Sequence, residues 1–307
     1  MHTRALILAT MVVAAALLAA CSDQPTTSGA AHSPSAVGPI PPLYPARVAV
    51  YGDSLLQQAQ PYFKRLMAAE DTSNTTYYSS HGGTALCDWL GRMRTMAKTT
   101  HFEAVMLEFS GNALTRCMEN VGYYTRALYA KYRADTMAAI GIWVPTGAHV
   151  FLIGAPVTRQ QQESVPNWDA LNLQYAQIAA ADPQHVTFVD AGLAVEGPGG
   201  NYAQTLPCYI GEPCTGPVVD GVRSNIVRSA DGVHFCPVAE VRGSCRAYSA
   251  GAFRFAAAMV HGLVTGAGPS YTSGSPAAQA TAPPVRFSAV QPASLSALAA
   301  VAERPPT

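Results

Sequence analysis

The chain has 307 residues, of which 49% are hydrophobic and only 12% charged, so it can bury a substantial core. Lysine and arginine together number 19, as do aspartate and glutamate, which gives a formal net charge of zero. Because no basic surplus exists to neutralise a phosphate backbone, nucleic acid is excluded as an expected partner.

The N-terminal segment has the features of a removable export signal. Arg4 is followed by an uncharged stretch from Ala5 to Ala20, which at 16 residues is shorter than the roughly 20 that span a bilayer. We therefore expect residues 1–20 to be a signal peptide and the mature chain to lie outside the cytoplasm. The small residues before Cys21 resemble a bacterial lipobox, whose cleavage leaves this cysteine as a lipidated N-terminus on the membrane. An ordinary secretory signal, which gives a freely secreted protein, is the alternative.

Composition divides the rest of the chain into one domain between two low-complexity segments. Residues 21–45 are rich in Ser, Thr, Pro, Gly and Ala, which is typical of a flexible tether. Residues 268–307 are rich in Ala, Pro and Ser and hold too few large apolar groups to offset the entropy of ordering them, so we expect a disordered tail. A single domain is predicted over residues 46–267.

Short apolar runs alternate along this domain with longer segments of helical periodicity. The predicted strands are Val48–Tyr51, Thr75–Tyr78, Ala104–Phe109, Val150–Ile153 and Val186–Val189. The predicted helices are Leu55–Ala69, Ala85–Lys98, Val121–Ile140, Asp169–Ala181 and Tyr248–Val264. This alternation predicts an α/β fold, a three-layer α/β/α sandwich with a five-stranded, mostly parallel sheet. Ligands of such sheets gather beyond the carboxyl ends of the strands.

The first predicted strand ends in a candidate nucleophile. In VAVYGDSLL, residues 48–56, Ser54 lies between the strand and the following helix. At a helix N-terminus the backbone amide of Ser54 is free, and the helix dipole favours negative charge, which suits a nucleophile whose intermediate is an oxyanion. The alternative is that Asp53 or Ser54 only caps the helix.

A base and an acid for such a nucleophile stand together near the end of the domain. In SADGVHFCP, residues 229–237, Asp231 and His234 are three residues apart, so both side chains can reach one site from a single loop. A serine hydroxyl needs a base to take its proton, and the base needs an acid to fix its tautomer. The alternative is an Asp-Gly turn followed by a structural histidine.

Two further loops follow strand ends and carry candidate oxyanion donors. In LEFSGNALTRC, residues 107–117, the side-chain amide of Asn112 can donate a hydrogen bond to an oxyanion. In SSHGGTALC, residues 79–87, Gly82 or Gly83 can bring a backbone N–H close to a substrate because no side chain intervenes. Serine, glycine, asparagine and histidine thus follow strand ends in chain order.

With these four blocks, residues 48–264 resemble the SGNH hydrolases, also called GDSL esterases and lipases. GDSL at Gly52–Leu55 matches the family's first block, and Asp231–His234 matches the Asp-x-x-His of its last. Gly83 fits the second block best, and Gly82 stays possible.

The third block departs from the family pattern. Where the family usually has Gly-x-Asn, this chain has Ser110, Gly111 and Asn112, so the donor is present but the first glycine is a serine. A Gly-x-Ser-x-Gly elbow, typical of α/β-hydrolases, does not surround Ser54.

The resemblance implies a flavodoxin-like SGNH hydrolase fold and a role for each matched residue. Ser54 would be the nucleophile, His234 the general base and acid, and Asp231 the acid that orients it. The oxyanion hole would consist of the Ser54 amide, the Gly83 amide and the Asn112 side chain. No cofactor and no metal ion are expected.

Besides Cys21, the chain has six cysteines, and an even count in an exported protein indicates three disulfides. Local spacing favours Cys208–Cys214 and Cys236–Cys245, which leaves Cys87–Cys117 by elimination, although six cysteines allow 15 connectivities. Without a Cys-x-x-Cys motif or clustered histidines, a zinc site is the weaker interpretation. Two of these bridges would hold the segments that carry the oxyanion donors and the base.

Residues 191–229 are expected to form a long irregular segment between the fifth strand and the base. Such segments often shape substrate pockets, and Trp168, Tyr202 and Tyr209 are aromatic side chains that can line one. Aromatic residues in such places more often only pack the segment against the domain.

The sequence therefore predicts a serine esterase that hydrolyses acyl esters, on envelope glycans or lipids, through an acyl-enzyme on Ser54. An O-acyltransferase with a sugar or lipid hydroxyl as acceptor would use the same residues and is the first alternative. A non-catalytic binding lipoprotein, which would not need the serine, histidine and aspartate together, is the second.

Overall fold

A computed structural model of the chain describes residues 45–70, 74–166, 169–238, 240–241 and 243–266. The expected signal peptide (1–20), the lipidation site Cys21 and the tail (268–307) lie outside these residues, as does the tether (21–45) apart from Pro45. Within the described part of the chain, no helix is both long enough and apolar enough to cross a membrane.

The helices and strands follow one another in a regular α/β order, with a group of short strands near the end. In chain order they are β1 (Arg47–Gly52), α1 (Ser54–Glu70), β2 (Thr75–Ser80), α2 (Leu86–Thr99), β3 (Ala104–Glu108), the 3₁₀ turn η1 (Arg116–Met118), α3 (Arg126–Trp143), η2 (Val144–Thr146), β4 (His149–Ile153), α4 (Arg159–Ser164), α5 (Ala170–Ala181), β5 (Val186–Val189), η3 (Ala191–Val195), β6 (Thr205–Pro207), β7 (Val218–Val219), β8 (Val222–Ile226), β9 (Glu240–Val241), β10 (Ser244–Cys245) and α6 (Ala250–Thr265).

The main sheet has five parallel strands in the order β2-β1-β3-β4-β5, so the predicted sandwich is confirmed. The register places the last residues of three strands side by side, with Gly52 of β1 between Ser80 of β2 and Glu108 of β3. The segments that leave these strands, which carry Ser54, Gly82 and Asn112, therefore start next to one another at one edge of the sheet.

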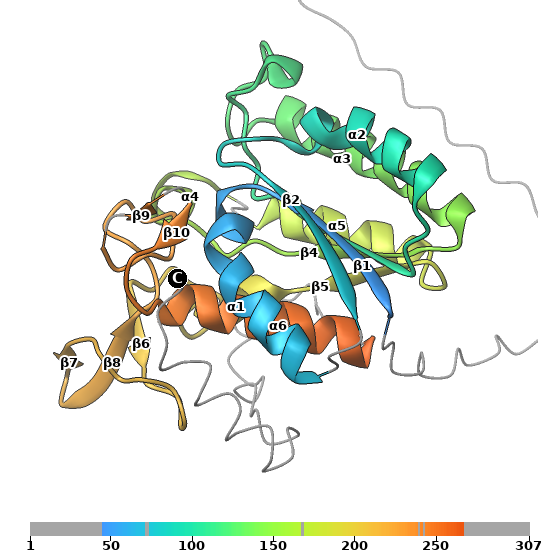
Figure 1. The fold of residues 1–307 in the computed structure, drawn as a ribbon. Coiled ribbons are helices and arrows are strands. Elements are labelled where there is room, and N and C mark those ends of the chain that lie inside the picture. The colour runs from blue at the N-terminus through green and yellow to red at the C-terminus, as the bar shows by residue number, and fades with distance from the viewer. Residues whose placement is uncertain (1–44, 71–73, 167–168, 239, 242, 267–307) are drawn as a thin grey trace, which may run out of the picture. The chain divides into compact units, whose positions relative to one another are not determined.

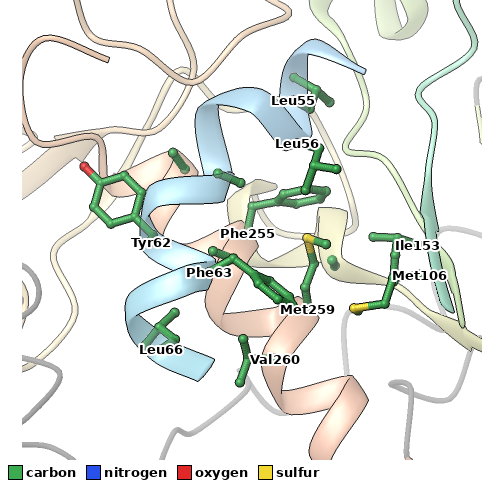
Figure 2. Packing of buried hydrophobic residues seen from close by; sticks show 14 of the residues in the cluster. Leu55, Leu56, Tyr62, Phe63, Leu66, Met106, Ile153, Phe255, Met259 and Val260 are labelled. Carbon is green, nitrogen blue, oxygen red and sulfur yellow. The ribbon is translucent and has the colours of Figure 1, made fainter. Parts of the chain in front are cut away.

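Two helical layers cover the sheet (Figure 1). Helices α1 and α6 pack on the face to which Val48 and Val50 point, and α2, α3 and α5 pack on the face of Ala49 and Tyr51. Figure 2 shows Phe63 of α1 and Met259 of α6 among the apolar side chains of the first layer. Burying a side chain of this size contributes about 1.5–3 kcal/mol, so the α1–α6 layer holds the helix that begins with Ser54 firmly against the sheet.

The helix predicted over Val121–Ile140 begins later in the structure than in the prediction. The apolar pattern placed its start at Val121, but α3 begins at Arg126, with Thr125 as its N-cap accepting a hydrogen bond from the Leu128 amide. Asn120 and Tyr124 have positive φ angles of 67° and 58°, which no α-helix accommodates. The helix can therefore form only after Tyr124.

The segment 191–229, expected to be irregular, contains regular structure. β8 pairs antiparallel with both β6 and β7, and Asp220 and Gly221, both with positive φ, form the turn between β7 and β8. An Asp-Gly pair flanked by valines is a hairpin signal that the sequence does contain. The short helix α4 was also not predicted, because its polar sequence RQQQES has no apolar periodicity.

Candidate active site

Ser54 and His234 meet at the edge of the sheet where β1 ends. Ser54 is the first residue of α1, and its Oγ lies 2.9 Å from Nε2 of His234. Nδ1 of the same imidazole lies 2.7 Å from Oδ2 of Asp231. With the Nδ1 proton donated to this carboxylate, Nε2 is the lone-pair nitrogen that accepts the Ser54 hydroxyl proton. The structure thus brings together the three residues predicted to carry the chemistry.

Asp231 is held as a carboxylate by its own loop. Its Oδ1 accepts hydrogen bonds from the Ser229 hydroxyl at 2.5 Å, the Val233 amide at 2.8 Å and the His234 amide at 3.0 Å. Burial raises the pKa of Asp231, but the hydrogen bonds from Ser229 and His234 outweigh it and hold that pKa well below the ordinary range. Asp231 is therefore ionised at neutral pH and can stabilise an imidazolium. Sequence reasoning gave Ser229 no role.

The loop that carries the base is held by α1, by a disulfide and by the start of α4. Ser54 and Gln58 are four residues apart on one face of the helix, and Oε1 of Gln58 accepts the Phe235 amide at 2.7 Å. The Cys236–Cys245 disulfide closes the loop one residue further on. On the other side of the loop, the carbonyl of Gly232 accepts a 3.1 Å hydrogen bond from the Arg159 amide at the start of α4. The imidazole is thus presented by a backbone with little freedom to move.

Asn112 joins the other two segments at this edge. Its side-chain amide donates to Oδ2 of Asp53 at 2.9 Å and to the carbonyl of Thr84 at 3.2 Å. Asp53 directly precedes Ser54, and Thr84 directly follows Gly83, so a single amide connects the first and second sequence blocks. Both of its N–H groups have acceptors in this arrangement.

The first amides of α1 differ in their hydrogen bonds. The Leu55 amide donates to Oδ1 of Asp53 at 3.0 Å, and the Leu56 amide to Oε2 of Glu108 at 3.2 Å. The Ser54 amide, in contrast, has no hydrogen-bond partner among the residues that the structure describes. A donor at the nucleophile itself is therefore available for a developing oxyanion.

Gly82 and Gly83 differ in what surrounds them. A Cβ added at Gly82 would lie 3.6 Å from Cβ of Ser54, whereas one added at Gly83 would meet no heavy atom within 4 Å. Gly83 has a φ of +76°, in the left-handed region that favours glycine. Gly82 thus lies close to the nucleophile, and Gly83 provides the turn.

The three predicted disulfides, Cys87–Cys117, Cys208–Cys214 and Cys236–Cys245, are all present. Cys87 is in the first turn of α2 and Cys117 is in η1, so their bridge ties the segment after Gly83 to the segment after Asn112. Asp88 lies close to these two sulfurs, but sulfurs joined in a disulfide are not thiolates that can bind a metal ion.

The aromatic side chains considered for a pocket pack against arginines. The Tyr202 hydroxyl accepts from Nη2 of Arg159 at 3.0 Å, and the Arg254 guanidinium lies 3.6 Å from the centre of the Tyr209 ring. Both tyrosines therefore hold their segments against the domain. Trp168 lies outside the described residues.

A family described as "Protein of unknown function (DUF459)" matches residues 47–241 of this chain. The chain belongs to this DUF459 family. The matched region contains the Ser54, Gly83, Asn112 and Asp231–His234 blocks. No curated protein matches the sequence.

Several solved structures are similar to this DUF459 chain. A lipase/acylhydrolase from Enterococcus faecalis is 16% identical, with 71% of this chain and 94% of that chain covered and a TM-score of 0.47. A catalytic mutant of Axe2, an acetylxylan esterase from Geobacillus stearothermophilus, is 14% identical, with the corresponding coverages 71% and 94% and a TM-score of 0.46. A putative platelet activating factor from Streptococcus pneumonia is 14% identical, with coverages of 74% and 86% and a TM-score of 0.46.

Proposed function

We propose that this DUF459 protein is a serine esterase that cleaves acyl esters through an acyl-enzyme on Ser54. The observation that carries the proposal is the continuous hydrogen-bonded series from Oγ of Ser54 through the His234 imidazole to Asp231, with distances of 2.9 and 2.7 Å. A hydroxyl, an imidazole and an ionised carboxylate in this order are the groups that nucleophilic acyl transfer requires.

In the first half of the reaction, Oγ of Ser54 forms a bond to the ester carbonyl carbon while Nε2 of His234 takes the hydroxyl proton. The carbonyl π electrons move to oxygen, and the oxyanion is bound by the Ser54 amide, by an amide of the Gly82–Gly83 turn and by the Asn112 side chain. When the intermediate collapses, the bond to the leaving alkoxide breaks and the alkoxide takes the proton from Nε2. The product on the enzyme is an ester of Ser54.

In the second half, water replaces the alcohol. Nε2 of His234 removes a proton from water as the water oxygen attacks the acyl carbon, and the proton is returned to Oγ of Ser54 as the acid leaves. The side chains of His234 and Asp231 are 32% and 50% exposed, so water reaches the triad. This exposure supports hydrolysis over transfer to an alcohol, for which water has to be kept away.

Asn112 takes part by exchanging one acceptor for another. We expect the longer hydrogen bond, to the Thr84 carbonyl at 3.2 Å, to be given up for the oxyanion, while the 2.9 Å bond to Asp53 keeps the amide in place. Because an oxyanion accepts more strongly than a carbonyl, the donor gains energy as the transition state forms.

A fluorophosphonate probe tests the proposal, because it labels only an activated serine. We expect the purified protein to be labelled and to hydrolyse p-nitrophenyl acetate, and Ser54→Ala to lose both by several orders of magnitude. Ser164→Ala, which changes an exposed serine at the end of α4, is the matched control and should behave as wild type. An unlabelled wild-type protein, or labelling that survives in Ser54→Ala, would contradict the proposal.

We further propose that the enzyme is exported, anchored to the membrane through Cys21, and acts on acyl esters of envelope glycans or lipids. The apolar segment that ends before Cys21 supports export, and three disulfides agree with an oxidising compartment. Radiolabelled palmitate should be incorporated in cells that express the full chain and not in cells that express Cys21→Ala. Equal incorporation, or none in either, would show that Cys21 is not acylated.

A further inference from the structure

Glu108 is a buried acid that the proposed reaction does not use. It is the last residue of β3, it is fully buried, and the strand register places it beside Gly52 of β1. A carboxyl group with no access to water needs a structural or electrostatic reason to be there.

Its contacts are with the start of the helix that carries the nucleophile. Oε2 of Glu108 accepts hydrogen bonds from the amide of Leu56 at 3.2 Å and from the amide of Asp53 at 3.4 Å. These amides lie on either side of Ser54 in the chain. One oxygen from a neighbouring strand therefore caps the first turn of α1, and among the residues described the Ser54 amide is left without an acceptor.

The backbone of the first sequence block is shaped around this carboxyl group. A Cβ added at Gly52 would lie 2.7 Å from Oε2 of Glu108 and 2.7 Å from its carbonyl oxygen. Real Cβ atoms do not approach oxygen so closely, so the carboxyl occupies the space that a side chain at Gly52 would need. The glycine before Asp53 is thus required by the close approach of Glu108 together with Cβ of Leu56.

Two buried carboxyl groups lie side by side here, and Glu108 is the one that keeps its proton. Burial, and then the negative charge of Asp53, raise the pKa of Glu108 well above its usual value. Burial raises the pKa of Asp53 as well, but hydrogen bonds from Ser110 and Leu55 act against that rise and favour its ionised form. A neutral acid accepts the two amides without placing a second negative charge behind the oxyanion.

We infer that Glu108 is a positioning residue of the oxyanion hole, which holds the amides on both sides of Ser54 so that the Ser54 amide is available to the substrate oxygen. The inference rests on the proposed esterase function. It assigns Glu108 to the geometry of the nucleophile and not to the transfer of a proton.

Three substitutions of Glu108 in the full chain separate this role from a merely structural one. Glu108→Gln keeps an oxygen acceptor at the same position. Glu108→Asp keeps the carboxyl group, but its side chain is one methylene shorter and its oxygens lie further from the two amides. Glu108→Met has a side chain of similar length without an oxygen acceptor. We expect kcat for p-nitrophenyl acetate to stay within a few-fold of wild type in Glu108→Gln and to fall in Glu108→Asp. In Glu108→Met it should fall on the order of 10²-fold or more. KM should change little in all three.

Glu103→Gln is the matched control, because Glu103 directly precedes the other end of β3 and accepts the Ala46 amide away from the site. The melting temperature of each variant shows whether it is folded. If Glu108→Met does not fold, the comparison of Glu108→Gln with Glu108→Asp decides. A role for the charge or the acid alone would make Glu108→Asp at least as active as Glu108→Gln.

Different experimental outcomes would overturn the role of Glu108 and the proposed esterase function. A wild-type protein that fluorophosphonate does not label removes the esterase itself. Two results in a labelled wild-type background would overturn the role of Glu108 and leave the esterase intact: a folded Glu108→Met with undiminished kcat, or a Glu108→Asp as active as Glu108→Gln.

Discussion

The Ser110 hydroxyl donates a 2.6 Å hydrogen bond to Oδ2 of Asp53, and the Ser110 amide donates to the same oxygen at 2.8 Å. Ser110 stands where SGNH hydrolases usually have glycine. The serine in this chain therefore adds a second donor to Asp53, whose Oδ2 also accepts the Asn112 amide. The serine found here in place of that glycine strengthens the contact that orients a candidate oxyanion donor.

Ser110→Ala is expected to lower kcat about tenfold and to lower the melting temperature. A hydrogen bond to a charged group contributes about 1.5–3 kcal/mol, and without it Asp53 and Asn112 are held less firmly. Ser110→Gly, which introduces the residue of the SGNH pattern, should show the same loss. Thr99→Ala, which removes an exposed hydroxyl at the end of α2, serves as the control. Wild-type kcat in Ser110→Ala would show that the hydroxyl does not contribute to positioning.

The fold was predictable because its signals are local. Each strand of the main sheet is a short run of residues suited to a buried strand, and each long helix repeats its apolar residues with helical period, so the bounds agree within a few residues. The start of α3 was not predictable in this way, since the positive φ angles of Asn120 and Tyr124 leave no trace in an apolar pattern.

The site was predictable only in part. Ser54, Asn112 and His234 could be found because each follows a strand end or matches a known block. Glu108 and Ser229 could not, because their partners are defined by proximity in space and not by spacing in the chain.

The Cys87–Cys117 disulfide is expected to support turnover as well as stability. The bridge connects the helix that follows Thr84 with the segment that follows Asn112. The Asn112 side chain itself donates a hydrogen bond to the Thr84 carbonyl. Replacing both cysteines by serine should lower kcat and, from the loop-closure entropy of a 30-residue separation, cost about 3–4 kcal/mol in the free energy of unfolding.

The Cys208–Cys214 bridge provides the comparison for that experiment. Its two cysteines are six residues apart, so loop-closure entropy gives a cost of about 2 kcal/mol in the free energy of unfolding when the bridge is removed. The loop between them is also held by the buried ion pair between Glu212 and Arg254. The double serine variant of this pair should lower the melting temperature and leave kcat near wild type. Equal kcat in both double variants would show that the Cys87–Cys117 bridge has no special relation to the site.

Gly52 and Gly91 are expected to respond in opposite directions to alanine. A Cβ at Gly52 meets Glu108 and Leu56 at 2.7 Å, so Gly52→Ala should destabilise the protein by on the order of 1–3 kcal/mol and lower kcat. Gly91 is inside α2 with nothing within 4 Å of an added Cβ, so Gly91→Ala should stabilise by about 0.5–1 kcal/mol through helix propensity. Urea unfolding of both variants tests this, and a Gly52→Ala protein as stable as wild type would be inconsistent with the tight packing of Glu108.

Asp231→Asn is expected to abolish most activity while the fold survives. An asparagine cannot hold the imidazole in the tautomer that leaves Nε2 as acceptor, so kcat should fall on the order of 10³–10⁴-fold with KM little changed. Asp182 makes a matched control, because its Oδ1 lies 2.8 Å from Nδ1 of His185 with the same three-residue spacing and similar exposure, away from the site. Asp182→Asn should keep wild-type kcat.

The same pair of variants tests the pH dependence of stability. Folding lowers the pKa of Asp231, so the ionised carboxylate stabilises the folded protein at pH values above the ordinary aspartate pKa of about 3.9. This stabilisation is lost as the pH falls from about 3.9 toward the pKa of Asp231 in the folded protein. The melting temperature of wild type should therefore exceed that of Asp231→Asn by more at neutral pH than at about pH 2–3. A difference that grows on acidification would mean that the hydrogen bonds from Ser229 and His234 do not favour the carboxylate, and the electrostatic support assigned to the imidazolium would be lost with it.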